Sequence, residues 1–482
     1  MSAHVAPAKR RWLGLALIAA AQFVVIMDTS IIGVALPDMQ AELGFTPESL
    51  SWVFNAYVVA FGGLLLLGGR LSDLLGARKV FVTGWIILAL GSVLAGAATN
   101  VGLEIAGRAV QGAGAALIAP AALSLLMALF GGTNELPRAF AVYGAAAPIG
   151  GTAGVFLGGV LTEYASWPWV FYITVPIAAL VVVLTPGALP GIAGQRGSVD
   201  IVGAVTGTAG LAALVYGVVR APEVGWAATE TLMALGGGIT LLVLFFIVQA
   251  RSRQPLLRLG IFRAPQLGAA NFAQLLLGAA WVPMWFFLNL YLQRVLGAGA
   301  FAAGAALLPM TILIVLGMTL VAPRLLAKFG AKPLVVAGFA FLTAGLVWLA
   351  FARPDGAYVL DVLPASLVAA FGMALAFVPS LGTAIGAARP EETGVASGLV
   401  NTSYQIGSAV GLASLTVLSS LVATGGTSAA DLTRGYAAAF IGAAVVAALG
   451  GLIAGVTLRG PQRANSTDVE QEASSPEQHV NA

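Results

Sequence analysis

The sequence contains no cysteine, and its only two histidines, His4 and His479, lie in the terminal tails. A buried Cys/His metal site and a cysteine or histidine nucleophile are therefore excluded. Charged residues are scarce as well, at 9% of 482 positions. We expect no catalytic residue, no metal site, no cofactor and no enzymatic activity.

Apolar residues make up 59% of the chain, and the mean hydropathy is +0.95, far above the range of soluble proteins. Reading windows of about 19 residues and asking for about 20 apolar residues per span predicts fourteen membrane helices. The predicted ranges are 13–36, 51–69, 80–98, 103–129, 139–161, 168–186, 201–219, 231–249, 269–291, 302–322, 334–352, 359–385, 396–421 and 436–457. The fold class is thus an all-α polytopic membrane protein.

The distribution of Lys and Arg predicts the orientation, because cytoplasmic loops retain positive charge. With the N-terminus inside, 18 of the 23 basic residues fall on the cytoplasmic side. The exceptions are Arg108 inside a predicted helix and four outer residues: Arg220, Arg294, Arg353 and Arg434. We predict a multi-pass protein of a bacterial plasma membrane with both termini in the cytoplasm.

Every loop between the predicted spans is short, so no soluble catalytic or nucleotide-binding domain fits between them. Transport energy would then have to come from an ion gradient. We expect the following organisation: 1–12, cytoplasmic tail; 13–190, first six-helix bundle; 191–264, a linker with two additional helices and the basic surface segment 251–263; 265–460, second six-helix bundle; 461–482, disordered cytoplasmic tail.

An internal repeat supports two related bundles. "GRLSDLLGARK" at 69–79 and "PRLLAKFGAKP" at 323–333 share Arg-Leu and a later Gly-Ala followed by a base at the same spacing. Each copy follows the second helix of a six-helix set, an arrangement used by repeat-built transporters. The alternative for the second copy is an ordinary basic turn between helices.

Six stretches together resemble the major facilitator superfamily, and within it the fourteen-helix drug:proton antiporters of the EmrB/QacA type. They are "MDTSIIGVALP" at 27–37, "GRLSDLLGARK" at 69–79, "GRAVQGAGAA" at 107–116, "GTAGVFLGG" at 151–159, "SWPWVFYITVP" at 166–176 and "GVASGLVNTSYQIGSAVG" at 394–411. The chain departs from the family pattern where Gly33 replaces an Asn and Val155 replaces a Pro. The resemblance implies two six-helix bundles with two extra central helices, and proton-coupled drug export.

Three charges fall inside predicted helices: Asp28, Glu104 and Arg108. Counting 1.5 Å per residue from the outer helix ends places Asp28 roughly 12 Å and Arg108 roughly 9 Å deep, so we expect them at comparable depth. Charges in lipid are costly and are usually functional, which predicts a proton-coupling site; the resemblance implies the same for Asp28 and Arg108. The alternatives are a structural ion pair, and for Glu104 an i,i+4 pair with Arg108.

Two predicted helices carry polar and aromatic stripes. On helix nine the stripe spans about 80° and on helix thirteen about 100° of the helical wheel. Aromatic planes with scattered amides suit flat organic cargo, whereas bonding between helices is the alternative. Together with Gln111 in the helix-four motif, the predicted cargo residues are Trp281, Trp285, Asn289, Gln274, Asn401, Tyr404 and Gln405.

A glycine repeat and the loop at 69–79 indicate which segments move during the transport cycle. Gly150, Gly154 and Gly158 recur every four residues and give one helix a smooth face, for which tight packing is the alternative reading. In the loop, Gly69 and Gly76 would permit the turn, and Leu71 would anchor it.

The acid of this loop, Asp73, is expected beside the start of the helix at Gly394, where free amides favour a carboxylate. Two further pairs are expected between Arg78 and Lys79 on one side and Glu391 and Glu392 on the other. Such a latch would close the cytoplasmic side; the alternative is a solvated loop that only sets topology.

We therefore predict a proton-driven exporter of hydrophobic organic compounds such as drugs, antibiotics or dyes. The expected partners are this cargo, protons and the lipid bilayer, with no nucleic acid, and the chain is expected to act as a monomer. Alternatives are a dedicated exporter of one endogenous metabolite and a non-transporting receptor on the same scaffold.

Overall fold

The computed structural model describes residues 8–45, 50, 52–191, 194, 200–252, 255, 260, 265–389, 392–423 and 428–458. Within these residues every regular element is helical, and fourteen helices are long and apolar enough to cross a membrane. The predicted all-α membrane fold is confirmed. Most of the basic segment 251–263 and the whole tail 461–482 lie outside the described residues.

The helices fall into three sets along the chain. The first bundle contains α1 (Ala8–Ser30), α2 (Ile32–Leu43), α4 (Trp52–Leu75), α5 (Ala77–Gly96), α6 (Val101–Phe130), α7 (Leu136–Tyr164), α8 (Trp169–Tyr172) and α9 (Thr174–Ala188). The two additional helices are α10 (Ile201–Val224) and α11 (Thr229–Arg251). The second bundle contains α12 (Pro265–Leu290), η2 (Tyr291–Val295), α13 (Ala300–Ala306), α14 (Leu308–Leu316), η3 (Gly317–Val321), α15 (Ala322–Phe329), α16 (Ala331–Leu349), η4 (Tyr358–Val362), α17 (Leu363–Gly386), α18 (Thr393–Ala423) and α19 (Ala429–Thr457).

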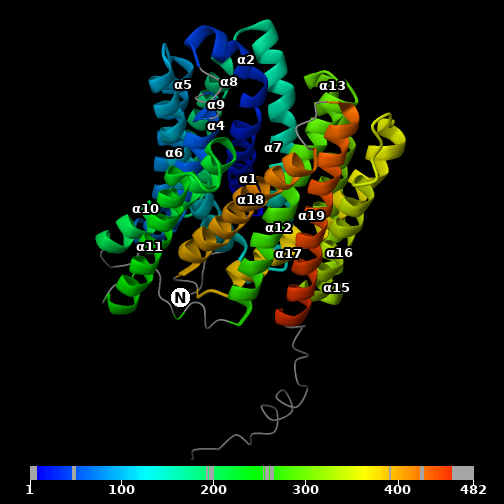
Figure 1. The fold of residues 1–482 in the computed structure, drawn as a ribbon. Coiled ribbons are helices and arrows are strands. Elements are labelled where there is room, and N and C mark those ends of the chain that lie inside the picture. Colours follow the sequence, from blue (N-terminus) through cyan, green and yellow to red (C-terminus); the bar gives the residue numbers. More distant parts are fainter. Residues whose placement is uncertain are drawn as a thin grey trace, which may run out of the picture.

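The two bundles stand side by side, with α10 and α11 on the outside of the first (Figure 1). The N-terminal end of the chain and the end of α19 lie at the same end of the molecule (Figure 1), as an even number of crossings requires. Helix α10 packs against α4 and also against α18, so the inserted pair touches both bundles.

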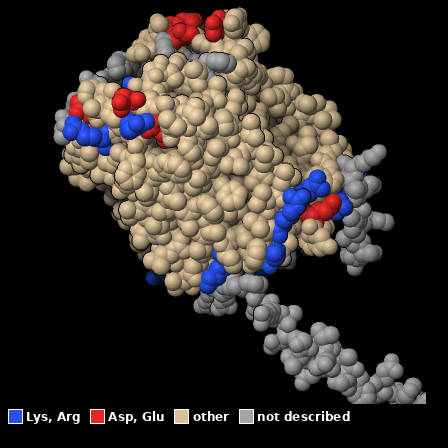
Figure 2. Space-filling model, turned by 90° about the vertical axis from the view of Figure 1, so that its right-hand side faces the viewer, with Lys and Arg blue, Asp and Glu red and all other residues tan. Residues whose placement is uncertain are grey.

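The surface matches a lipid environment. Figure 2 shows a broad uncharged face, with the visible charged side chains gathered toward the two ends of the molecule. Large apolar side chains are exposed in many helices, among them Val183 at 73%, Met233 at 68% and Val456 at 77%. An exposed apolar belt of this kind is stable only where lipid replaces water.

Several helix ends differ from the sequence prediction: α4, for example, continues to Leu75 instead of ending near residue 69, so Gly69 lies within this helix and not at the predicted turn. For α1 and α9 the reason is packing. Helix α1 begins at Ala8 rather than near residue 13, because Arg10 donates to the carbonyl of Gly187 and Arg11 pairs with Glu135 at 3.0 Å. Helix α9 continues to Ala188, into the segment expected as a loop, because the helix end is buried against the bundle. Packing thus extends both helices beyond their apolar windows.

Both copies of the internal repeat break the chain in the same way. Gly76 separates α4 from α5 with φ of 92°, and Gly330 separates α15 from α16 with φ of 78°. Only glycine adopts this region without strain. The two copies therefore share a backbone turn and not merely basic residues.

Three π-helical turns, η2, η3 and η4, interrupt the second bundle, and the described part of the first bundle has none. Pro323 lies two residues after the end of η3, and Pro364 lies two residues after the end of η4. Proline removes a backbone donor, and a local π adjustment re-pairs the freed groups within a membrane helix.

Candidate functional site

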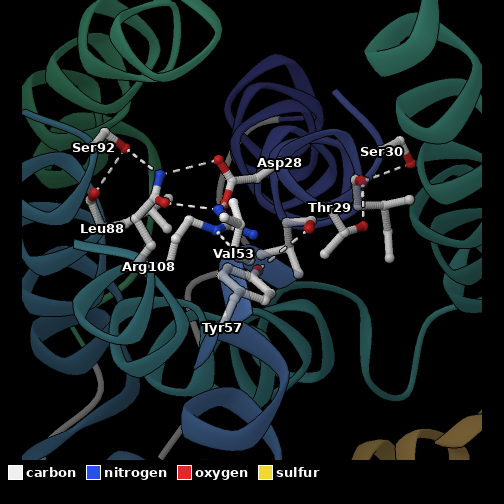
Figure 3. A network of polar contacts seen from close by, with 11 residues as sticks. Asp28, Thr29, Ser30, Val53, Tyr57, Leu88, Ser92 and Arg108 are labelled. Atoms are coloured by element: carbon white, nitrogen blue, oxygen red, sulfur yellow. Dashed lines mark hydrogen bonds and ion pairs between the residues drawn. The ribbon is translucent and has the colours of Figure 1, made fainter. Parts of the chain in front are cut away.

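A buried ion pair joins α1 to α6 in the first bundle (Figure 3). Arg108 Nη1 lies 2.8 Å from Asp28 Oδ2, and both side chains are 0% exposed. The prediction that these two residues lie at comparable depth is confirmed. A buried charge pair is retained only where further hydrogen bonds satisfy its remaining groups.

Further contacts hold the guanidinium in place. Arg108 Nε donates to the carbonyl of Val53 at the start of α4, at 2.8 Å, and Arg108 Nη1 also donates to Gln111 Oε1 at 2.7 Å. The ring of Tyr57 faces the guanidinium at 4.6 Å, and its hydroxyl donates to the carbonyl of Val25 on α1. Arg108 thereby ties α1, α4 and α6 together.

Gln111 belongs to this network and not to the cargo surface for which it was predicted. It is 0% exposed, and its Nε2 donates to Asp28 Oδ1 at 3.1 Å and to Ser92 Oγ at 2.8 Å. Ser92 in turn donates to the carbonyl of Leu88 on α5. Gln111 therefore orients the carboxylate of Asp28, and its position three residues after Arg108 on α6 explains why it reaches the same partner.

Glu104 is not paired with Arg108, contrary to the i,i+4 pair favoured by the sequence. The carboxyl is 0% exposed, and neither oxygen has a hydrogen-bond partner among the described residues. The reason is that the guanidinium is drawn to Asp28 and Val53 instead. Arg108 Nη2 is also unpartnered within the described part of the chain.

The three glycines at four-residue spacing seat α7 on α1. A Cβ added at Gly150 or Gly154 would lie 2.3 or 2.8 Å from a backbone carbonyl oxygen of α1, and one added at Gly158 would lie 2.6 Å from the carbonyl oxygen of Ile31, directly after α1. The middle one of these oxygens belongs to Met27, next to Asp28. The face is therefore a tight contact within the first bundle that positions the ion pair, and the predicted sliding role stays a prediction.

The predicted contact between Asp73 and the start of α18 is confirmed. Asp73 Oδ1 accepts from the amide of Gly394 at 2.9 Å, and Oδ2 accepts from the amide of Val395 at 3.1 Å. A Cβ added at Gly69 would lie 2.5 Å from the carbonyl oxygen of Gly394, so the backbones of α4 and α18 touch here. Leu71 packs at the edge of the core. The role of this contact as a latch stays a prediction.

Arg78 has a partner in the first bundle, and its predicted pairing with Glu391 or Glu392 stays a prediction. Arg78 Nη1 donates to the carbonyl of Leu189, at 3.4 Å, within the first bundle. Arg78 lies in the first turn of α5, beside the end of α9, and this turns it away from α18. Lys79 is exposed, and Glu391 lies outside the described residues, so its pairing is not described.

The predicted cargo residues of α12 divide into two groups. Gln274 is 1% exposed and donates to Ser380 Oγ at 3.0 Å and to the carbonyl of Phe377, which joins α12 to α17. Its contacts fit the alternative of bonding between helices. Trp281 is 8% exposed and Trp285 is partly exposed, with ring centroids 6.4 Å apart.

On α18, Asn401, Tyr404 and Gln405 are all partly exposed. Asn401 donates to the carbonyl of Ser397 in its own helix, and the ring of Tyr404 meets Phe377 edge-on at 5.8 Å. Asn289 on α12 is also partly exposed and accepts from Gln293. These residues retain accessible surface, which Gln111 and Gln274 do not.

Sequence reasoning missed Val53, Tyr57 and Ser92, which complete the network around Asp28. Backbone carbonyls carry no sequence signal, and Tyr57 and Ser92 are unremarkable within apolar helices. It also missed the hydrogen bond between Thr152 on α7 and Thr311 on α14, at 2.6 Å, which joins the two bundles. Isolated hydroxyls of this kind usually bond to their own helix.

A family description, Major Facilitator Superfamily, matches residues 18–412, which is most of the chain. The chain belongs to the Major Facilitator Superfamily. It is therefore a multi-pass membrane protein of a family of transporters, and the expected resemblance is confirmed.

Three relatives within this superfamily share the length of the chain. The cephamycin export protein CmcT of Amycolatopsis lactamdurans is 41% identical, covering 89% of each protein. The puromycin resistance protein pur8 of Streptomyces alboniger is 37% identical over 88% of this chain and 84% of its own length. The methylenomycin A resistance protein of Bacillus subtilis is 33% identical over 83% of this chain and 85% of its own length.

Solved structures share the superfamily fold. The human organic anion transporter MFSD10 superposes with a TM-score of 0.66 at 16% identity, over 93% of this chain and 100% of the other. The transporter FucP in its outward conformation superposes with a TM-score of 0.59 at 17% identity, over 92% of this chain and 99% of the other. At this identity the likeness shows the fold alone.

Proposed function

We propose that this chain exports small hydrophobic organic compounds, antibiotics among them, in exchange for protons. The relatives named as antibiotic export or resistance proteins support the direction and the class of cargo. The observation that carries the proton coupling is the ion pair of Asp28 and Arg108, fully buried in a membrane bundle. A carboxylate in such a place is a site where a proton can be bound and released.

Protonation of Asp28 removes the charge to which Arg108 and Gln111 now bond. Because Arg108 also holds the start of α4 through Val53, a change at Asp28 alters the link between α1, α4 and α6. Asp73 lies near the other end of the same helix α4, where it bonds to α18. Helix α4 therefore connects the proton site to the contact between the bundles.

This contact is at the predicted cytoplasmic end, and it holds the two bundles together there. The carboxylate of Asp73 caps free amides at the start of α18, a position where the helix dipole favours negative charge. In the proposed cycle the contact is made when the cytoplasmic side is closed and broken each time that side opens. Arg78 bonds to the carbonyl of Leu189 within the first bundle.

The proposed cargo surface lies on α12 and α18 of the second bundle and includes Trp281, Trp285, Tyr404 and Gln405. These side chains offer aromatic planes and amide groups without a buried charge. The surface therefore suits neutral or singly charged aromatic compounds, and divalent cations are expected to be poor cargo.

Transport into proteoliposomes with an imposed pH gradient tests this function. Purified protein should accumulate puromycin or a fluorescent hydrophobic dye against its gradient, and collapsing the pH gradient with a protonophore should release it. Loss of accumulation on collapse separates proton coupling from passive exchange. Accumulation that persists without the pH gradient would contradict the proposal.

A dedicated exporter of one metabolite is the second candidate, because one relative at 41% identity is named as an exporter of a single antibiotic. Competition between several unrelated aromatic compounds in the same assay distinguishes the two. Mutual inhibition supports a broad exporter, whereas transport of one compound without competition supports a dedicated one.

A further inference from the structure

Glu104 is a buried carboxyl that the proposed cycle has not used. It lies in the first turn of α6, one turn before Arg108, with 0% of its surface exposed. Neither of its oxygens has a hydrogen-bond partner among the described residues. Buried polar groups are nearly always paired, so an orphaned carboxyl inside a charge network needs a physical reason.

The charge state of Glu104 follows from what surrounds it. An ionised carboxylate that is buried without a partner is strongly disfavoured, whereas a protonated carboxylic acid is tolerated far better. The start of α6 favours an anion through the helix dipole, but this effect is weak and falls off within one turn. Burial therefore prevails, and Glu104 is the neutral acid while Arg108 is engaged elsewhere.

Arg108 is placed to change partners. Its Nε and Nη1 are held by Val53, Asp28 and Gln111, and its Nη2 is unpartnered in the described part of the chain. Side chains four residues apart on a helix share one face, so Glu104 lies within reach of this free donor. Once Asp28 is neutral, Glu104 is the nearest remaining counter-charge on α6.

We propose that Glu104 holds a proton while Arg108 is paired with Asp28, and gives it up to pair with Arg108 when Asp28 becomes protonated. The proposal rests on the proposed function, in which Asp28 is the coupling carboxylate. In the exchange an O–H bond of Glu104 breaks and an O–H bond of Asp28 forms. The three side chains keep one positive and one negative charge throughout.

The exchange explains why two acids, Asp28 and Glu104, accompany one base, Arg108, in the buried cluster. With one proton shared between the two carboxyls, the buried cluster carries no net charge in either state. With Asp28 alone, its protonation would leave Arg108 as an uncompensated charge inside the membrane, which is costly. Of the other elements around the network, α4 contributes the titratable Tyr57, and α5 contributes the neutral Ser92.

Infrared spectroscopy of the protein in lipid nanodiscs tests the proton assignment without transport. At neutral pH the wild type should show the C=O band of a protonated carboxylic acid, which Glu104→Gln removes and Glu104→Asp retains at a shifted position. The decisive variant is Asp28→Asn, in which Glu104 should be ionised by Arg108 and the band should vanish although Glu104 is present. A merely structural Glu104 would give the same spectrum in both backgrounds.

Transport supplies the second readout. Glu104→Gln should lose accumulation driven by the pH gradient while keeping downhill cargo exchange, because the neutral amide mimics only one of the two states. Glu104→Asp should recover part of the accumulation. The matched control is Glu163→Gln, which removes an exposed carboxylate at the end of α7 and should change neither the spectrum nor export.

The outcomes separate this proposal from the function on which it rests. If the wild type accumulates no cargo, the proposed function fails, and the infrared band still decides the protonation of Glu104. If the wild type accumulates cargo but Glu104→Gln leaves the spectrum and the accumulation unchanged, the exchange between the two carboxyls is overturned and proton coupling through Asp28 remains.

Discussion

The two bundles share a backbone plan but differ in chemistry. Gly76 in the first and Gly330 in the second make the same left-handed turn after the second helix of each bundle. Three residues before each turn, the first bundle has Asp73, which caps α18, and the second has Ala327, which has no group to do so. Of the two copies, only the first can supply a carboxylate to the opposite bundle at this position.

The two bundles also differ in the charged residues that they bury. The first buries Asp28, Glu104 and Arg108 with no exposed surface, whereas the amide Gln274 of the second bundle bonds to neutral groups. One acid of the second bundle, Asp361, sits at a helix end and pairs with Arg353, whose side chain is 58% exposed. A repeated scaffold thus keeps its backbone plan while its two halves differ in buried charge, which is the basis of the proposed division between a proton site in the first bundle and a cargo surface in the second.

The largest effect is expected from Asp28→Asn, which removes the negative charge of the buried pair. Accumulation driven by the pH gradient should disappear, because no proton can be bound and released at this position. Neutral cargo should still bind, since the second bundle is untouched. Flux and equilibrium binding in the same vesicle preparation measure the two separately.

The matched change in the second bundle is Gln274→Leu, which removes two hydrogen bonds between α12 and α17. It should lower the free energy of unfolding by about 1–3 kcal/mol but leave accumulation per folded molecule intact. Loss of proton-driven accumulation in this variant would break the division of roles between the bundles.

A smaller but still severe effect is expected from Gly154→Leu. A side chain here meets the carbonyl oxygen of Met27 at once, so α1 must move and displace Asp28. Overpacking should cost about 1–3 kcal/mol, and export should fall more than the amount of folded protein does. The control is Gly159→Leu on the same helix, where an added Cβ meets nothing within 4 Å and export should be retained.

Asp73→Asn comes next, because it removes a charge from two backbone hydrogen bonds. Hydrogen bonds to charged groups are worth about 1.5–3 kcal/mol, so the population with an open cytoplasmic end should rise by a factor of about ten or more. The chain contains no cysteine, so Ser30→Cys supplies the sole thiol, and its labelling from the outer side should slow. Asp200→Asn, which alters the cap of α10, is the control. Unchanged labelling and unchanged export in Asp73→Asn would contradict the proposed role of Asp73 as a latch.

The smallest effect concerns the cargo surface. Replacing Trp281 or Trp285 by Leu removes aromatic contact worth about 0.5–1.5 kcal/mol, so KM for an aromatic cargo should rise about two- to tenfold with little change in kcat. Trp348→Leu is the control, because Trp348 is 47% exposed on the apolar surface of α16. An equal effect of Trp348→Leu would place the proposed surface in doubt.

The sequence predicts the fourteen membrane helices well because a membrane helix requires only a sufficiently long run of apolar residues, which can be counted directly. It also predicts the depth of Asp28 and Arg108, since a helix converts residue counts into distance. It does not predict which way a long side chain turns. Arg108 bonds to α1 and α4 rather than to Glu104, and Gln111 bonds to Asp28. These partners lie on helices that are distant in the sequence, so local spacing does not predict them.

The contact of Asp73 was predictable for a different reason. A helix start offers free amides whatever its sequence, so an acid near it needs no specific partner side chain. Arg78 has no such general target, and its partner at Leu189 depends on how far α9 extends. The contact of Asp73, predicted from a backbone property, is therefore confirmed, whereas the side-chain pair of Glu104 with Arg108 does not form.

The π-helical turns η2, η3 and η4 give the second bundle a mechanical property of its own. Each such turn replaces regular i→i+4 bonds by the wider i→i+5 pattern. Only η3 lies between two α-helical segments, α14 and α15, which can tilt relative to each other at this turn, whereas η2 ends the helix of α12 and η4 begins the helix of α17. The described part of the first bundle has no such joint. During rocking, the first bundle should move as a stiff body, while in the second bundle the helix made of α14, η3 and α15 should bend at η3.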